Sequence, residues 1–297
     1  MAATAASTAS PLAHRGAQLI IGGWTFFLVE NVVLSENRER LVTYLGGETT
    51  YRALYGTLST AACCSIAVGY FRFGRGRGPM VWKPGPGMQL AAFGAQAVGL
   101  VGFSQLAPPL QVPFTFGPVA TAPPVHQHPP VSDEAAANAR TAGQAMGLAA
   151  RCPIDFNARE KIEGKELAGA KRITRHPMLW SMALCGIGSA FGTPLLTEVA
   201  FGVFPAVMAV IGGAHQDHRH VRSGAANPTF MAATSHLPFY ALVMQSLERG
   251  TEPWLELADE MAWTNAGVAL AVAVALASRR VARVPHLLKK QQPQLQK

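Results

Sequence analysis

Apolar residues in this chain gather into long uncharged runs, and they do not alternate with polar residues. A run of about 18 apolar residues is long enough to cross the hydrocarbon core of a bilayer, where a helix satisfies its own backbone. A soluble helix would keep one polar face. The stretch from Met178 to Ala214 has no such face, because Glu198 is its only charged residue. The pattern predicts an all-α fold, a polytopic transmembrane helical bundle with five to six spanning helices.

Six runs fit this description, and a seventh apolar stretch, residues 237–247, is too short to span. We expect that shorter stretch to lie at the interface, to form a re-entrant segment or to pack on the bundle. The predicted spans are residues 17–34, 53–73, 88–107, 178–196, 198–214 and 262–278.

The fourth and fifth runs predict a tight hairpin. The fourth follows Arg175-His176-Pro177, and proline is favourable at a first helical position because its missing N–H would have no partner there. The chain turns near Gly192-Thr193-Pro194 and returns to the segment that begins at His215. We therefore expect His176 and His215 to lie on the same membrane face.

The segment between the third and fourth runs differs in composition from the rest. Residues 108–131 hold eight prolines and no charge, which predicts extended, irregular chain. Residues 132–150 are alanine-rich and predict a helix capped by Ser132. We divide the chain into a disordered or targeting tail, a transmembrane domain with a Pro/Ala-rich insertion at about 108–150, and a basic polar tail. These parts are residues 1–16, 17–279 and 280–297.

Composition agrees with a membrane protein and excludes several other classes. The chain is 49% hydrophobic and 14% charged, whereas soluble domains carry roughly 25% charge. Its formal charge of +8 suits helix ends anchored by Lys and Arg, and no basic stripe with base-reading residues indicates nucleic acid. The cysteines lack metal-ligand spacing and predict no disulfide framework. They are Cys63, Cys64, Cys152 and Cys185.

Two groups of polar residues are candidates for chemistry, although no catalytic residue can be assigned. His176 is either an interfacial histidine or a metal ligand or acid–base group. Asp217 and its neighbouring histidines form either a solvated helix end or part of a metal site, with His176 and His215 as the candidate ligands. Glu30 interrupts an apolar run, so it either faces the bundle interior with a function or reaches the interface.

Four segments together resemble one family. The run from Lys171 to Pro177, followed by Leu179-Trp180, resembles the signature of the NnrU-like membrane protein family, which includes plant and algal 15-cis-zeta-carotene isomerases. The order and spacing of the four fit from about residue 20 to residue 250, and residues 113–131 look like an insertion. The other three segments are Ala214–Arg219, Thr234–Phe239 and Leu45–Tyr55.

The resemblance implies a b-type haem held by two histidines. One is His176, and the other lies in the first helix, at the position that Glu30 occupies here. A carboxylate is a poorer ligand for low-spin haem iron, so the two-histidine haem does not carry over intact.

Three functions are compatible with the resemblance. The first is a haem-dependent isomerase that acts on a hydrophobic polyene within the lipid bilayer, in a plastid membrane. The second is a non-enzymatic accessory protein linked to nitrogen-oxide or haem metabolism. The third is a membrane methyltransferase or reductase, because those enzymes also carry Arg-His-Pro before a helix.

Overall fold

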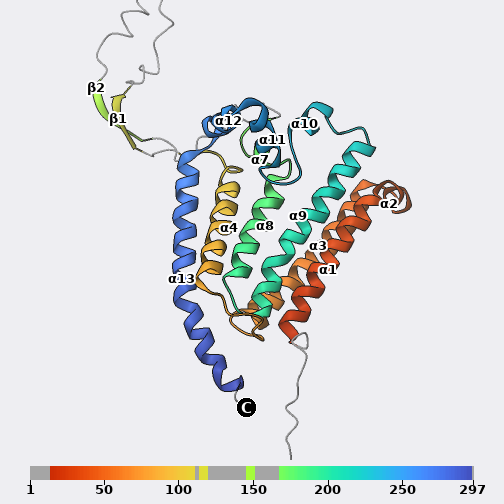
Figure 1. Ribbon diagram of the computed structural model, residues 1–297. Coiled ribbons are helices and arrows are strands. Elements are labelled where there is room, and N and C mark those ends of the chain that lie inside the picture. The colour runs from red at the N-terminus through yellow and green to blue at the C-terminus, as the bar shows by residue number, and fades with distance from the viewer. Residues whose placement is uncertain (1–13, 111–113, 120–144, 151–166, 296–297) are drawn as a thin grey trace, which may run out of the picture. The chain divides into compact units, whose positions relative to one another are not determined.

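The computed structural model describes residues 14–110, 114–119, 145–150 and 167–295 of the chain. They form two compact units, residues 1–107 with 162–297 and residues 108–161. In the larger unit, long helices lie side by side and short helices cover one end of them (Figure 1). The long ones are α1 (Arg15–Glu36), α3 (Glu48–Val68) with its π-helical extension η2 (Gly69–Gly74), α4 (Pro86–Ser104), α8 (Pro177–Phe191), α9 (Leu196–Arg222) and α13 (Trp263–Leu295). The short ones are α2 (Arg38–Tyr44), α7 (Ala170–Ile173), α10 (Pro228–Ala233), α11 (Tyr240–Arg249) and α12 (Glu252–Glu260).

Several of these helices are suited to a bilayer. Within the described residues, α1, α3 with η2, and α9 are long and apolar enough to cross, and the pair α12–α13, bent by 86°, would be a fourth span. Only 28%, 17% and 50% of the apolar stretches of the first three are buried. The remaining apolar side chains, such as Phe26 and Phe71, face outward, as lipid contact requires. The chain is a helical membrane protein, and the predicted five to six spans are not confirmed.

The helical hairpin is present, but its two arms differ in length from the predicted runs. Helix α8 has 15 residues and ends at Phe191, and the Thr193-Pro194 that follows Gly192 is not helical. At about 1.5 Å per residue it is about 22 Å long, short of a core of roughly 30 Å. Helix α9 continues beyond the predicted end at Ala214 as far as Arg222. The polar residues after Ala214 therefore lie on the helix, and their directions are fixed by it.

Small residues fix α8 between α4 and α9. A Cβ atom built on Gly186 of α8 would overlap the carbonyl oxygen of Gly202 of α9, and one on Gly202 would overlap that of Gly186. On the other side, a Cβ on Gly99 of α4 would lie 2.6 Å from the backbone nitrogen of Cys185. Helices in membranes associate through such close backbone approaches. The position of α8 is thus set by backbone contact on two sides.

The short helices are tied to the segment just before α8. Arg172 of α7 makes a two-pronged ion pair with Glu260 of α12, with N···O distances of 2.7 and 2.9 Å, and a further bond of 2.7 Å to Glu256. The backbone N–H of Arg175 donates to Ser235 (2.9 Å), and that of Phe239 donates to the carbonyl of Ile173 (2.8 Å). Residues 234–239 therefore lie alongside the residues that precede α8.

The smaller unit contains two antiparallel strands, β1 (Phe114–Val119) and β2 (Ala145–Ala150), with Phe114 opposite Ala150. The predicted helix over residues 132–150 is therefore wrong in its described part, residues 145–150. Glycine weakens a helix, and Gly147 pairs with Gly117 in the ladder. The start of that helix, residues 132–144, and most of the predicted N-terminal tail lie outside the described residues.

Candidate metal centre

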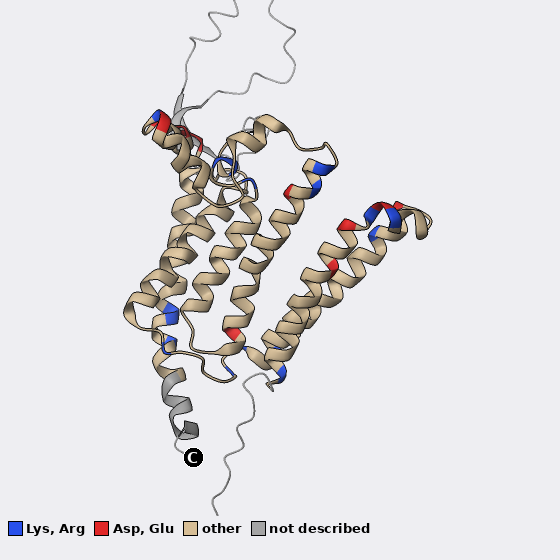
Figure 2. Cartoon of the chain, turned by 45° about the vertical axis from the view of Figure 1, so that its right-hand side comes forward, with Lys and Arg blue, Asp and Glu red and all other residues tan. Residues whose placement is uncertain are grey.

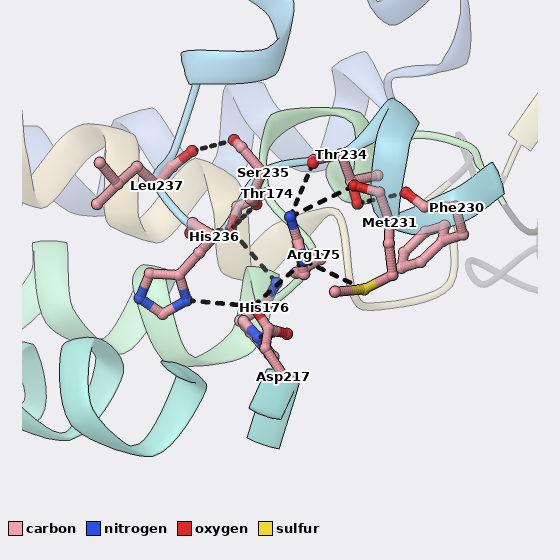
Figure 3. A network of polar contacts seen from close by, with 10 residues as sticks. All are labelled: Thr174, Arg175, His176, Asp217, Phe230, Met231, Thr234, Ser235, His236 and Leu237. Atoms are coloured by element: carbon pink, nitrogen blue, oxygen red, sulfur yellow. Dashed lines mark hydrogen bonds and ion pairs between the residues drawn. The ribbon is translucent and has the colours of Figure 1, made fainter. Parts of the chain in front are cut away.

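His176 and Asp217 meet at the open end of the hairpin, where α8 begins and α9 approaches its C-terminal end. His176 immediately precedes Pro177, and a residue before proline is pushed away from the helical conformation, here to φ −118° and ψ 59°. Its ring leaves the helix axis toward α9, and its Nε2 lies 2.8 Å from Oδ1 of Asp217 (Figure 3). Both side chains are largely buried, with exposed fractions of 10% and 18%. The predicted approach of the hairpin ends thus places an imidazole against a carboxylate.

The third member of the group is His236, which comes from residues 234–239, the segment beside the start of α8. The hydroxyl of Thr174 donates to the carbonyl of His236 (2.7 Å), which fixes the backbone beside the hairpin. The Nδ1 atom of His236 lies 3.9 Å from Oδ2 of Asp217, and its ring centre lies 5.4 Å from that of His176. Both ring nitrogens of His236 are buried without a hydrogen-bond partner among the described residues. Two unpaired buried nitrogens are costly unless a ligand occupies the space they face.

These three side chains have the composition and spacing of a metal site. Each offers one ligand atom, and the three atoms lie within 4.8 Å of one another. Zinc bonds of about 2.0–2.2 Å in tetrahedral geometry place ligand atoms roughly 3.4 Å apart, so small side-chain shifts would close the site. Two histidines and one carboxylate with open positions suit Zn²⁺ or Fe²⁺. The arrangement can therefore hold an ion and leave room for a further ligand.

Neighbouring charges orient the carboxylate and keep the third ligand neutral. Arg175 lies 3.3 Å from Oδ2 of Asp217 and donates to the carbonyl of Thr234 (2.9 Å). Burial lowers the pKa of His236, and the adjacent His176 and Arg175 lower that pKa further against the opposite effect of Asp217. A neutral imidazole keeps the lone pair that binds a metal. Partners that fix the ligands in this way are typical of metal sites.

The structure places the candidate ligand His215 on another side of α9. Its Nε2 is 2.6 Å from the hydroxyl of Ser35 on α1, and its Nδ1 is 4.0 Å from Glu36. Residues two apart on a helix point about 200° away from each other, so His215 and Asp217 face opposite neighbours. The group around His176 therefore contains Asp217 and His236. The sequence pattern does not mark His236 as a ligand, although this residue lies in the segment Thr234–Phe239.

The second implied haem ligand position, Glu30, lies in the interface between α1 and α3. Only 5% of Glu30 is exposed. Its Oε1 accepts hydrogen bonds from Ser59 (2.6 Å) and Asn31 (2.9 Å), and its Oε2 is buried without a partner. Within the described part of the chain, no hydrogen bond or ion pair joins Glu30 to His176, whose Nε2 is directed at Asp217. The structure thus pairs each of the two side chains with other residues, and the haem that the resemblance implies stays a prediction.

The described residues define a helical membrane protein with a histidine–carboxylate group at one end of its bundle. The model of a protein family described as NnrU protein matches residues 18–284, nearly the whole chain. The chain belongs to the NnrU family, in agreement with the resemblance seen in its motifs. No curated protein and no solved structure matches the sequence.

Proposed function

We propose that this NnrU-family protein is an integral-membrane metalloprotein that binds a divalent transition-metal ion, Zn²⁺ or Fe²⁺. The ligands are His176, Asp217 and His236, at the end of the bundle covered by the short helices. The single observation that carries the proposal is the imidazole of His236, which lies beside a carboxylate and a second imidazole and whose two buried nitrogens have no hydrogen-bond partner among the described residues. An ion would satisfy one nitrogen directly and leave an open coordination position for an exogenous ligand.

The proposal is tested by cobalt titration of the detergent-purified protein after chelator treatment. Cobalt(II) binds the same ligands as zinc, and its visible absorption spectrum reports the coordination geometry of the bound ion. We expect one equivalent to bind and His236→Ala to weaken binding at least about tenfold, because a metal site with one ligand fewer loses much of its affinity.

His220→Ala is the matched control, because it removes an exposed imidazole from α9, the helix that carries Asp217, and lies outside the group. It is expected to bind cobalt as the unchanged protein does. Equal affinity of all three proteins, or no binding by the unchanged protein, would contradict the proposal.

Isomerisation of a hydrophobic polyene is the second candidate function, and it implies a plastid membrane. Its support is an apolar cavity of about 360 Å³ between α4, α8, α12 and α13. Trp180 lines this cavity and packs against His236 with ring centres 5.8 Å apart. An apolar chain bound there would lie next to the candidate metal centre. Pockets of this kind bind ligands through apolar walls and a few polar groups.

This second candidate is tested by conversion of 15-cis-zeta-carotene in bacteria that accumulate it in the dark. We expect the unchanged protein to convert it and Val101→Trp, which fills the cavity, to lose conversion. Leu90→Trp on the same helix is the control, since Leu90 is 71% exposed and does not line the cavity. Failure of the unchanged protein, beside a known isomerase that succeeds, would rule this function out.

A further inference from the structure

The end of the bundle opposite the candidate metal centre carries an excess of positive charge. Figure 2 shows mixed charges at the end with the short helices and mainly Lys and Arg at the other. Among the described residues, Glu198 in the first turn of α9 is the one acid at this end. The basic residues at this end are Arg15, Arg72, Arg75, Arg77, Lys83, Arg279, Arg280 and Arg283.

Four of these arginines line one cavity of about 400 Å³ beside the turn between α8 and α9. They are Arg75, Arg279, Arg280 and Arg283, and Glu198 is the only acid in the lining, so the cavity has three positive charges in excess. The remaining walls include the apolar side chains of Phe201 and Leu276. The cavity thus combines a cationic part with an apolar part.

Two of the arginines are held rigidly by the fold. Arg280 donates to the carbonyl of Gly188 (3.0 Å) and to Oε1 of Gln96 (2.6 Å), both neutral acceptors. It crosses Gly192 so closely that a Cβ there would overlap its Cδ atom. Because Arg280 makes no ion pair within the described residues, its charge is available to an anion.

The carboxylate of Glu198 is already fully engaged. Oε1 accepts from Arg283 (2.5 Å) and from the backbone N–H of Gly76 (2.9 Å), while Oε2 accepts from Thr193 (2.7 Å). It therefore neutralises one arginine and holds it in place. Within the described part of the chain, no ion pair involves the exposed side chains of Arg75 and Arg279, which also face the cavity. Like charges gathered in one cavity repel each other unless an anion is present.

The cavity lies where the uncharged stretch of α13 ends and its basic segment begins. The uncharged part of α13 runs from Trp263 to Ser278 and is about 24 Å long at 1.5 Å per residue. Trp is enriched at both membrane–water interfaces and Lys and Arg anchor helix ends, so Trp263 and Arg279 mark the two ends of this apolar stretch. Basic pockets between helices at this level bind anionic headgroups.

We propose that this cavity binds the phosphate of an anionic phospholipid, with an acyl chain against Phe201 and Leu276. Arg280 and Arg283 form the rigid part of the headgroup site, and Arg75 and Arg279 add charge from its rim. The proposal is independent of the metal centre, because the residues of the two sites do not overlap.

The experiment is native mass spectrometry of the detergent-purified full chain with phosphatidylglycerol, phosphatidylcholine or inorganic phosphate. We expect retention of one phosphatidylglycerol, in preference to phosphatidylcholine. The double variant Arg75→Gln/Arg279→Gln is expected to weaken that retention on the order of tenfold, from the loss of two charges near the headgroup.

The matched control is Arg72→Gln/Arg77→Gln, which removes the same charge from the same end but touches neither the cavity nor Glu198. It is expected to retain phosphatidylglycerol as the unchanged protein does. Equal losses in the two double variants would mean attraction by overall charge, and equal retention of phosphatidylcholine would mean no headgroup site. Displacement of phosphatidylglycerol by an equal concentration of inorganic phosphate would overturn the assignment to a lipid.

Discussion

Replacing Gly186 with valine is expected to prevent the helical bundle from assembling. Any Cβ at this position would overlap the carbonyl oxygen of Gly202 and lie 3.3 Å from the ring of Pro205, so α8 and α9 would have to separate. Overpacking of this kind costs about 3 kcal/mol or more when backbone atoms are in the way. We expect loss of the monodisperse peak in size-exclusion chromatography, or a large fall in the midpoint of thermal unfolding.

The control for this prediction is Gly94→Val in α4. A Cβ at Gly94 meets nothing within 4 Å, so the same change of residue type there tests helix propensity without the helix crossing. Valine is a better helix former than glycine, and the unfolding midpoint should stay close to that of the unchanged protein. A midpoint for Gly186→Val equal to that of Gly94→Val would show that the two helices do not depend on this contact.

The same crossing explains why the helices were predictable from the sequence and their contacts were not. Long uncharged runs mark the helices because the pattern is local along the chain. The partners of α8 are set by small residues such as Gly99 and Gly186, which an apolar run contains without any visible period. The length of α8 also escaped prediction, because Phe191-Gly192-Thr193 is apolar enough to extend the run although the helix ends there.

The candidate metal centre was also predictable only in part: the sequence indicated its location, but did not identify two of its three residues as ligands. Topology alone placed His176 near the far end of the returning helix, and Asp217 is found there. Whether His215 or Asp217 faces His176 depends on which side of α9 each residue occupies. The sequence settles this only if the helix is known to continue to Arg222. His236 arrives from a segment sixty residues from His176, through backbone hydrogen bonds that carry no side-chain pattern.

Helix α9 also supplies the sharpest test of the metal centre, Gly213→Ala. A Cβ on Gly213 would overlap Cε1 of His236, and it would lie 3.0 Å from Nδ1 of that ring and 3.1 Å from Cδ2 of His176. One added methyl group therefore displaces two proposed ligands while every ligand side chain remains present. Altered support of metal ligands weakens binding 10–100-fold, and we expect the upper end of this range or more because two ligands move. Cobalt titration and competition with zinc measure the change.

The neighbouring glycine separates loss of the site from loss of the helix. A Cβ on Gly212 would lie 3.1 Å from the terminal methyl of Met208, a flexible side chain that can move aside. Gly212→Ala makes the same chemical change one residue away, on the same buried helix, and is expected to bind cobalt normally. Equal affinities for Gly212→Ala and Gly213→Ala would mean that the ion does not bind between His176 and His236. A loss of cobalt affinity in Gly213→Ala alone would place the ion between His176 and His236. Both imidazoles pack against the backbone of α9 at Gly213, so a methyl group there moves them.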